Sequence, residues 1–288
     1  MGLNWSIIDH GTIMKTVEFK KETINDHLYR IHGLGDACMY FIHGSSKGLL
    51  VDTAYGVGDL KGYIESFWSK PYDVLITHGH ADHANGIDQW DEVYMNSKDQ
   101  NLFATKTNIG LRRTMLRRTV CDIDEYSDDL FHVGFHGHFK ELYDGMIFDL
   151  GGLHVKAIAA PGHTQGMMTL LLQEDRIILF GDACGVFTFL FKPESSTVAV
   201  YAQSLKHLKS YETYYDRVLR QHGTCESPKS VLDENLEVAE SILAGSDDHI
   251  PFEYLGEHHW LAKAIDPQTG QRLDGKNGNI VYAMNKIR

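Results

Sequence analysis

Apolar residues recur along the chain with two spacings, one typical of short β-strands and the other of amphipathic helices. In the first third, residues 27–32, 37–43 and 47–53 are rich in β-branched and aromatic residues and are separated by turns that contain glycine. This pattern predicts three strands. The spacing in 58–68 predicts a helix, and the apolar run DVLIT at 73–77 predicts a short buried strand.

The region after this strand is first helical and then irregular. We expect one helix over 82–90 and a second over 97–120, from the helical spacing of their apolar residues. Residues 121–140 are polar, with aspartate and histidine scattered through them. Because the stretch 98–140 has too few apolar residues for a core of its own, we expect a mostly helical insertion and not a separate domain.

Strand signals resume at about residue 142 and alternate with helices up to the C-terminus. Gly151-Gly152 and Glu174-Asp175 each separate two apolar runs and indicate hairpins. The expected strands are 146–149, 154–159, 167–173, 176–181, 217–221 and 279–284, the expected helices are 198–214 and 230–244, and the last strand is expected at a sheet edge. The alternation predicts a layered α/β architecture. We expect a single domain over 1–288, with a C-terminal helix-plus-strand extension at about 225–288.

Composition restricts the class of function. Apolar residues make up 43% of the chain, which is ordinary for a folded protein. The net charge of −12 and the lack of a long basic stripe argue against a nucleic-acid partner. One local basic cluster, Arg112, Arg113, Arg117 and Arg118, fits a solvated helix face, and contact with an anionic substrate is the alternative.

The cysteines and the N-terminal segment bear on the cellular location. The four cysteines lie far apart without a Cys-x-x-Cys pair, which suits reduced thiols better than a disulfide framework. Residues 1–15 show no charged segment followed by a long apolar run, and no window approaches the ~18 apolar residues of a membrane span. These features predict a cytoplasmic protein without a membrane partner.

The most informative segment is THGHADH at 77–83, directly after the expected buried strand. Imidazole and carboxylate ligands suit zinc, manganese or iron. The absence of a nearby cysteine argues against a thiolate site. Alternation at the strand end places His78 and His80 on one side, where they can bind one ion. Asp82 and His83 begin the next helix and can reach a second ion. Although the chain has 17 histidines, such a pattern arises by chance only on the order of once in a few hundred chains.

Four residues cannot complete two ion sites, and three later segments offer further ligands. His163 lies in the turn PGHTQG, Asp182 follows the apolar run IILF, and His222 lies between a predicted strand and Gly223. A histidine or aspartate in a turn is more often simply solvated, so each segment alone is a modest signal. After a His-x-His-x-Asp-His motif, the three segments together predict a binuclear metal centre.

In this order, from about residue 27 to 223, the segments resemble the metallo-β-lactamase superfamily, and most closely its glyoxalase II and lactonase-like branch. The resemblance implies a four-layer αββα sandwich with the metal ions at one edge of the two sheets. It assigns His78, His80 and His163 to the first ion, Asp82, His83 and His222 to the second, and Asp182 to a bridging position. The insertion and the C-terminal tail are not covered by the resemblance.

Further residues are candidates for orienting the ligands or contacting a substrate. Metal-bound imidazoles need hydrogen-bond partners, and Asp52, Thr77 and Thr164 are placed for this role or for structural roles in turns. Candidates for substrate contact are Tyr55, Phe187, Phe189, Tyr254, His258 and His259. The run FTFLF at 187–191 is more often ordinary core, and Cys184 is expected to be a buried small residue and not a ligand.

The expected function is hydrolysis of a small ester, lactone or thioester by a binuclear metal-dependent enzyme. Two divalent ions, Zn²⁺ or alternatively Mn or Fe, would lower the pKa of a shared water from about 15.7 toward 7. The resulting bridging hydroxide would act near Asp82 and Asp182, the predicted catalytic residues, and Asp82 would also handle the proton.

Three other functions are compatible with the same metals. A phosphodiesterase or nuclease is disfavoured by the acidic charge. A β-lactamase-type amide hydrolase is disfavoured by the missing export signal and by the aspartate at Asp182. A non-hydrolytic iron redox or sensor protein is disfavoured by the complete set of ligands. The expected partner is a small-molecule substrate, and a homodimer formed through the insertion is left open.

Overall fold

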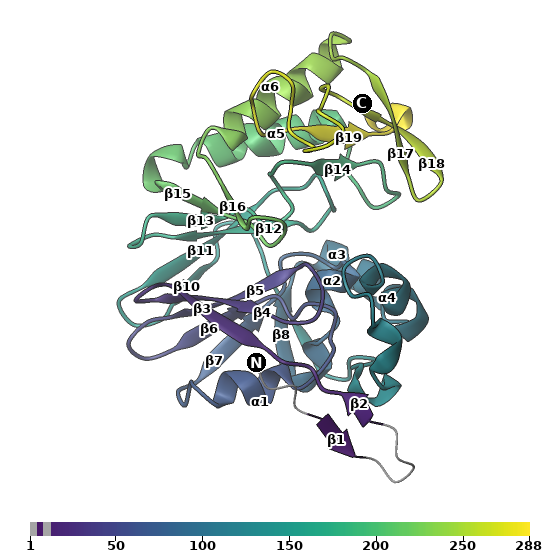
Figure 1. Cartoon of the computed structure of the whole chain (residues 1–288). Helices are drawn as coiled ribbons and strands as arrows, with labels where there is room; N and C mark the ends of the chain where they lie inside the picture. The colour runs from purple at the N-terminus through teal and green to yellow at the C-terminus, as the bar shows by residue number, and fades with distance from the viewer. Residues whose placement is uncertain (1–4, 8–12) are drawn as a thin grey trace. The chain divides into compact units, whose positions relative to one another are not determined.

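The computed structural model describes residues 5–7 and 13–288, so the N-terminal residues used above to judge location fall partly outside the described residues. The chain forms two compact units (Figure 1). The first comprises Met1–Glu141 and Asp149–Gly152, and the second comprises Leu142–Phe148 and Leu153–Arg288. The expectation of one domain over the whole chain stays a prediction.

The first unit is built on a seven-stranded sheet whose strands follow one another in chain order, β3 to β9. The strands are β3 (Lys20–Asn25), β4 (Leu28–His32), β5 (Cys38–His43), β6 (Gly48–Val51), β7 (Tyr72–Leu75), β8 (Glu92–Met95) and β9 (His138–Glu141). Strands β3 to β6 pair antiparallel, whereas β6 to β9 pair parallel, which requires crossover connections. The crossovers carry α1 (Leu60–Glu65), α2 (Ala81–Ala84), α3 (Ser97–Ala104) and α4 (Ile109–Leu116). A separate pair joins β1 (Trp5–Ile7) to β2 (Ile13–Lys15).

The core of the first unit packs against the sheet strands that lead into the metal motif. Phe41, Leu50 and Val74 of the sheet pack in one buried cluster with Leu60 and Ile64 of α1. Because β6 and β7 are parallel neighbours, their carboxyl ends lie at the same sheet edge. The segments that follow these two strands are therefore brought together.

The helix expected over 82–90 is interrupted. Helix α2 ends at Ala84, and a 3₁₀ turn, Ile87–Gln89, follows. The interruption arises where the chain packs against the loop after β6: the amide N–H of Gly86 donates to Thr53 Oγ1 at 3.0 Å. A Cβ on Gly56 of that loop would lie 2.0 Å from the Asn85 carbonyl oxygen. A continuous helix would not permit this approach.

The helix expected over 97–120 is two helices, and the arginine cluster is a solvated face only in part, because Arg117 and Arg118 are exposed. Asn108 caps the second helix, with its side chain accepting from the Leu111 amide at 3.0 Å. Arg112 of α4 is buried and donates to the carbonyl oxygens of Tyr55 at 2.8 Å and His132 at 2.6 Å. Arg113 donates to the Asp128 carboxylate. Arg112 and Arg113 thus tie α4 to the loop after β6 and to the loop that follows α4.

The second unit contains two sheets and two long helices. The six-stranded sheet has the order β10-β11-β12-β13-β15-β16, and the four-stranded sheet has the order β14-β19-β18-β17. The first sheet consists of β10 (Ile147–Asp149), β11 (His154–Ala159), β12 (Met168–Leu172), β13 (Ile177–Leu179), β15 (Arg217–Leu219) and β16 (Glu226–Ser227). The second consists of β14 (Thr188–Leu190), β17 (Ile250–Tyr254), β18 (Glu257–Leu261) and β19 (Ile280–Tyr282).

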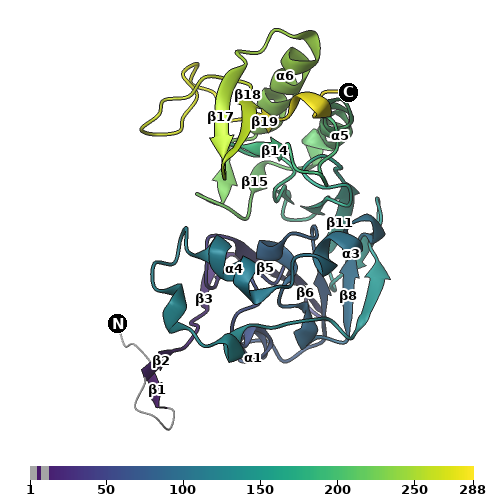
Figure 2. The ribbon, with the colours of Figure 1, turned by 90° about the vertical axis from the view of Figure 1, so that its right-hand side faces the viewer.

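Helices α5 (Val198–Lys209) and α6 (Val231–Ala244) lie side by side (Figures 1 and 2). Tyr201 of α5 and Val238 of α6 share one buried core with Ile178 of the six-stranded sheet and with Leu190 and Ile280 of the four-stranded sheet. The two helices thus hold both sheets of this unit together.

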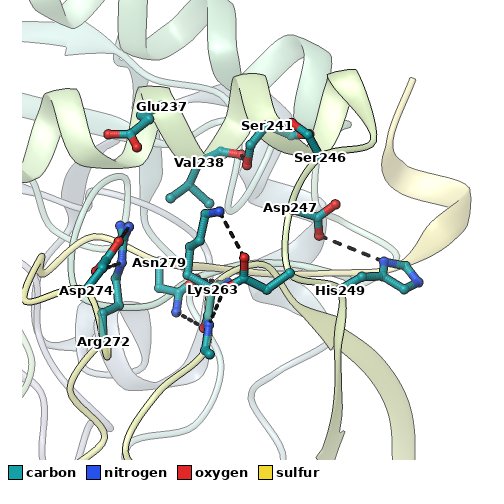
Figure 3. Close-up of polar contacts among 12 residues, drawn as sticks. Glu237, Val238, Ser241, Ser246, Asp247, His249, Lys263, Arg272, Asp274 and Asn279 are labelled. Carbon is teal, nitrogen blue, oxygen red and sulfur yellow. Dashed lines mark hydrogen bonds and ion pairs between the residues drawn. The ribbon is translucent and has the colours of Figure 1, made fainter.

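The C-terminal segment differs from expectation in two ways. Strand β19 is not at a sheet edge but lies between β14 and β18. The hairpin of β17 and β18 was not expected, because its sequence is polar and rich in histidine. The loop that returns to β19 is held by polar contacts (Figure 3): the Asn279 side chain accepts from the Lys263 amide at 3.0 Å and donates to the Lys263 carbonyl at 2.8 Å. Among the described residues, no helix combines the length and apolarity needed to span a bilayer.

Candidate metal centre

In the first unit, Asp52 organises the expected metal motif. Asp52 follows β6 in a left-handed conformation, with φ of 65°, which aspartate tolerates better than most residues. Its Oδ1 accepts from the Thr77 amide at 2.7 Å, and its Oδ2 accepts from the Thr77 hydroxyl at 2.9 Å. The same Oδ2 lies 2.8 Å from His83 Nδ1. One buried carboxylate therefore contacts both the residue before the motif and the last histidine in it.

These contacts determine which ring nitrogens face a metal. Since a carboxylate only accepts, His83 Nδ1 must carry the proton that it shares with Asp52, which leaves Nε2 with a lone pair. The Thr77 hydroxyl uses its proton on Asp52, so it accepts from His78 Nδ1 at 3.1 Å. His78 Nε2 is then also unprotonated. Both imidazoles are fully buried, and these contacts orient them as metal ligands.

The donor atoms of His78 and His80 are spaced suitably for one ion. His78 Nε2 lies 3.0 Å from His80 Nδ1. Two nitrogens bound tetrahedrally at 2.0–2.1 Å from zinc would be about 3.3 Å apart. Asp82 follows at the start of α2, is partly exposed, and has Oδ2 3.8 Å from His83 Nε2. The residues of the first unit therefore fit divalent metal binding.

Close backbone packing supports this loop. The Gly79 amide donates to the buried Asp99 carboxylate of α3 at 2.9 Å. A Cβ at Gly79 would lie 2.5 Å from the Asp99 carbonyl oxygen, so only glycine allows the approach. Asp99 was not expected as a support, because its position at the start of a helix does not indicate a contact 20 residues away in the chain.

In the second unit, the three remaining expected ligands lie in loops at one edge of the six-stranded sheet. His163 follows β11, Asp182 follows β13 and His222 follows β15. Strands β13 and β15 are parallel, and β11 runs in the same direction because it is antiparallel to β12, which is antiparallel to β13. The carboxyl ends of all three strands thus meet at one edge.

The His163 ring is oriented by the main chain of another strand. His163 Nδ1 lies 3.1 Å from the Phe189 carbonyl oxygen of β14, which can only accept, so Nε2 is left unprotonated. The Ser195 hydroxyl donates to the His163 carbonyl at 3.0 Å. The amide of Gly162 donates to the carbonyl of the buried Thr164 at 3.0 Å, which closes the turn. Sequence patterns do not reveal a main-chain partner, so Phe189 was not expected to orient His163.

Asp182 lies between the two histidines of this unit. Its Oδ2 is 3.6 Å from His163 Nε2 and 3.5 Å from His222 Nε2. An oxygen and a nitrogen bound to the same ion at about 2.1 Å lie roughly 3.3 Å apart. The oxygen of Asp182 is therefore spaced suitably to bind a metal ion together with either imidazole nitrogen.

Cys184 does not join these ligands. It is fully buried, its sulfur accepts from Asn235 Nδ2 at 3.4 Å, and burial raises the pKa of its thiol to about 12. A thiol with such a pKa is a poor metal ligand.

The candidates for substrate contact fall into different surroundings. Tyr55 is buried in a cluster of the first unit with Val57 and Leu116. Phe187, Phe189 and Tyr254 join a cluster of the second unit. His258 is exposed on β18, whereas His259 is buried.

A family model of the metallo-beta-lactamase superfamily matches residues 33–99, which include the whole His-x-His-x-Asp-His motif. The metallo-beta-lactamase from Pontibacter korlensis has a similar structure, with a TM-score of 0.55 at 14% sequence identity over 77% of this chain and 99% of that chain. Both comparisons show that the chain is similar to the metallo-β-lactamase superfamily. The expected fold class, α/β with the metallo-β-lactamase fold, is confirmed.

Three known proteins are similar to this chain in sequence. The beta-lactamase-like protein 2 homolog of Caenorhabditis elegans is 27% identical over 70% of this chain, which spans 63% of that protein. The acyl-coenzyme A thioesterase MBLAC2 of Homo sapiens is 24% identical over 73% of this chain and 72% of its own length. The probable polyketide biosynthesis zinc-dependent hydrolase BaeB of Bacillus velezensis is 21% identical over 73% of this chain and 88% of its own length. The expected class of enzyme, a metal-dependent hydrolase, agrees with the names of the human and Bacillus velezensis relatives.

Proposed function

We propose that this chain is a binuclear metal-dependent hydrolase that cleaves acyl thioesters. The metal ligands in this proposal are those that the family resemblance assigns. His78, His80 and His163 bind the first ion, Asp82, His83 and His222 bind the second, and Asp182 bridges them.

The observation that carries the proposal is the position of Asp182 Oδ2, at 3.6 Å and 3.5 Å from the Nε2 atoms of His163 and His222. The family resemblance assigns these two histidines to different ions, and a carboxylate oxygen between them suits a shared ligand. The orientation of His83 by Asp52 at 2.8 Å adds a second support, because a ligand held in the binding tautomer loses less entropy when the ion arrives.

Nitrogen and oxygen donors without a thiolate are compatible with zinc, and the relative from Bacillus velezensis is named as a zinc-dependent hydrolase. The bound ions would supply a water of lowered pKa and would polarise the carbonyl of the substrate. Asp82, which is partly exposed next to His83, is placed to accept a proton and to pass it to the leaving group.

The choice of thioesters rests on the human relative, which is named as an acyl-coenzyme A thioesterase. It also agrees with Asp82 as the proposed proton-transfer group, because a carboxyl group is a weak general acid near neutral pH. A leaving thiol has a pKa near about 8.5, so a thiolate departs without a strong general acid. No observation favours a phosphodiester substrate, because Arg112 and Arg113 are engaged in contacts within the first unit. The cytoplasmic location stays a prediction.

The proposal is tested by metal content and hydrolysis measured on the same preparations. The wild-type chain is loaded with zinc, desalted and analysed by mass spectrometry, and thiol release is followed with acetyl, octanoyl and palmitoyl thioesters of coenzyme A. A lactone, a phosphodiester and a β-lactam are assayed in parallel. The variants are Asp182→Asn and His222→Ala, and His136→Ala, an exposed histidine outside the ligand set, is the control.

We expect two ions per chain and chelator-sensitive thioester cleavage in the wild type and in His136→Ala. His222→Ala should hold about one ion, and Asp182→Asn should lose turnover by at least about a hundredfold. Full loading without cleavage of any thioester, or two tightly held ions in His222→Ala, would overturn the proposal.

A further inference from the structure

The four-stranded sheet of the second unit has two different faces. Thr188 and Leu190 of β14 are buried, and the Thr188 hydroxyl lies 3.2 Å from the Tyr201 hydroxyl of α5. Ile280 and Tyr282 of β19 belong to the same core as α5 and α6, and Figure 2 shows both helices on one side of this sheet. Side chains alternate along a strand, so the residues between these positions point to the opposite face.

That opposite face is aromatic. We call it the aromatic face and define it by Phe187, Phe189, Phe191, Phe252, Tyr254 and His259, which pack over Leu261 and Val281. The Phe189 and Tyr254 rings are 5.3 Å apart, and the Phe191 and Tyr254 rings are 5.4 Å apart. Phe187, Phe189, Phe252 and Tyr254 are only partly buried, so their rings offer apolar surface for a ligand.

His259 is the one histidine of the aromatic face as defined above. Its ring stacks on Phe191 with centroids 4.0 Å apart and is 7% exposed. Neither ring nitrogen has a hydrogen-bond partner among residues 13–288; Nε2 lies 3.4 Å from the Glu257 carboxylate, and Nδ1 has no charged group opposite it. Because a buried polar atom without a partner is destabilising, Nδ1 indicates a position for a polar group of a ligand. Trp260, the next residue, packs toward the helices, which places His259 on the aromatic face.

The aromatic face is connected directly to the expected metal ligands. Phe189 contributes its ring to this face, and its carbonyl oxygen holds His163 Nδ1 at 3.1 Å. The other nitrogen of the His163 ring is 3.6 Å from Asp182. The aromatic face therefore adjoins His163, an expected ligand of the metal that would bind the reacting end of a substrate.

We infer that the aromatic face binds the acyl chain of the substrate and that His259 Nδ1 forms a hydrogen bond with a hydroxyl or keto oxygen on this chain. The inference rests on the proposed function, because an acyl chain is the expected ligand of this face only if the substrate is an acyl thioester. It adds a preference that a thioesterase need not have: oxygenated acyl chains of medium length over short or plain ones.

The test measures binding and turnover separately on the zinc-loaded full chain. Isothermal titration with acetate, octanoate, 3-hydroxyoctanoate and 8-hydroxyoctanoate reports chain binding without hydrolysis, and acetate corrects for binding of the carboxylate to metal. The matching coenzyme A thioesters give kcat/KM. Phe189→Ala removes the ring and keeps the carbonyl that orients His163. His259→Phe keeps the stack on Phe191 and removes the nitrogens, and His258→Phe, an exposed neighbour on β18, is the matched control.

We expect octanoate to bind more tightly than acetate, and Phe189→Ala to weaken octanoate binding about tenfold with unchanged metal content. The better of the two hydroxy acids should bind the wild type and His258→Phe about fivefold more tightly than octanoate, a preference lost in His259→Phe. Should Phe189→Ala fail to fold, Phe187→Ala tests the same face.

The outcomes separate this inference from the proposed function. Thioester cleavage that is indifferent to chain length, with Phe189→Ala and Phe187→Ala equal to wild type, overturns the inference and leaves the function standing. A hydroxyl preference that survives in His259→Phe overturns the role of His259. If octanoate does not bind and Phe189→Ala converts a dimer into a monomer in sedimentation, the face is a contact between two copies. Acid binding without thioester cleavage refutes the proposed function alone.

Discussion

Asp52 offers a sharp test of how the protein prepares its ligands. Its two carboxylate oxygens accept from three donors, the Thr77 amide, the Thr77 hydroxyl and His83 Nδ1, at 2.7, 2.9 and 2.8 Å. Asp52→Asn keeps the shape of the side chain and replaces one acceptor by an amide NH₂. Either orientation of the amide places its NH₂ against at least one donor, so rotating the side chain cannot restore all three hydrogen bonds.

The magnitude follows from these contacts. A lost hydrogen bond to a charged group costs roughly 1.5–3 kcal/mol, and the variant loses one or two. His83 can relieve the conflict by moving its proton to Nε2, so that Nδ1 accepts from the new amide. That tautomer blocks the nitrogen that would bind the metal, so binding must reverse it. We expect zinc affinity to fall 10- to 100-fold, about 1.4–2.7 kcal/mol, and the free energy of unfolding of the metal-free chain to fall by about 1–3 kcal/mol.

The assay is a titration of the chelator-stripped chain with zinc against a coloured competing chelator, followed by urea unfolding of the metal-free protein. Asp129→Asn removes the same charge from an exposed residue and is the control, with both quantities expected within error of wild type. Wild-type zinc affinity in Asp52→Asn would refute the reasoning that Asp52 sets the tautomer of His83. A variant that unfolds in buffer would be compared with Thr77→Val, which removes the hydroxyl between Asp52 and His78 alone.

Three further predictions concern the framework around the site. Gly162→Ala should lower the free energy of unfolding by about 1–3 kcal/mol, measured in urea, because its Cβ would lie 2.5 Å from the Tyr201 ring; an unchanged midpoint would contradict this. Arg112→Met should lower the same quantity by about 2–5 kcal/mol through two unpaired carbonyl oxygens, whereas Arg117→Met, whose ion pair is exposed, should cost less than ~1 kcal/mol. The hydrogen bond with Asp88 raises the pKa of His132, so its stabilisation is full below about pH 6.5 and is lost as pH rises through the raised pKa. The difference in unfolding free energy between wild type and His132→Gln should accordingly shrink from pH 6 to pH 8.5, and a pH-independent difference would count against the pair.

Local spacing was sufficient for much of the fold and for the types of ligand. Most strands and the helix α6 lie within a few residues of the expected positions, because period-2 and period-3.6 patterns reflect burial within a single element. The His-x-His-x-Asp-His motif needs only the end of one strand and the start of the next helix. The segments around His163, Asp182 and His222 share a similar local signature, a ligand type after an apolar run and beside glycine.

Tertiary structure alone decided the properties that depend on contacts between distant segments, namely the protonated ring nitrogens and the burial of charged side chains. The proton on His83 is located by Asp52, 31 residues away, and that on His163 by the Phe189 carbonyl, 26 residues away. Arg112 is buried, although its sequence suggests a solvated face, because carbonyl oxygens of two other segments accept from it. A sequence specifies which groups can bind a metal or carry a charge. Their protonation, orientation and burial depend on the polar partners that folding brings next to them, and no local pattern records those partners.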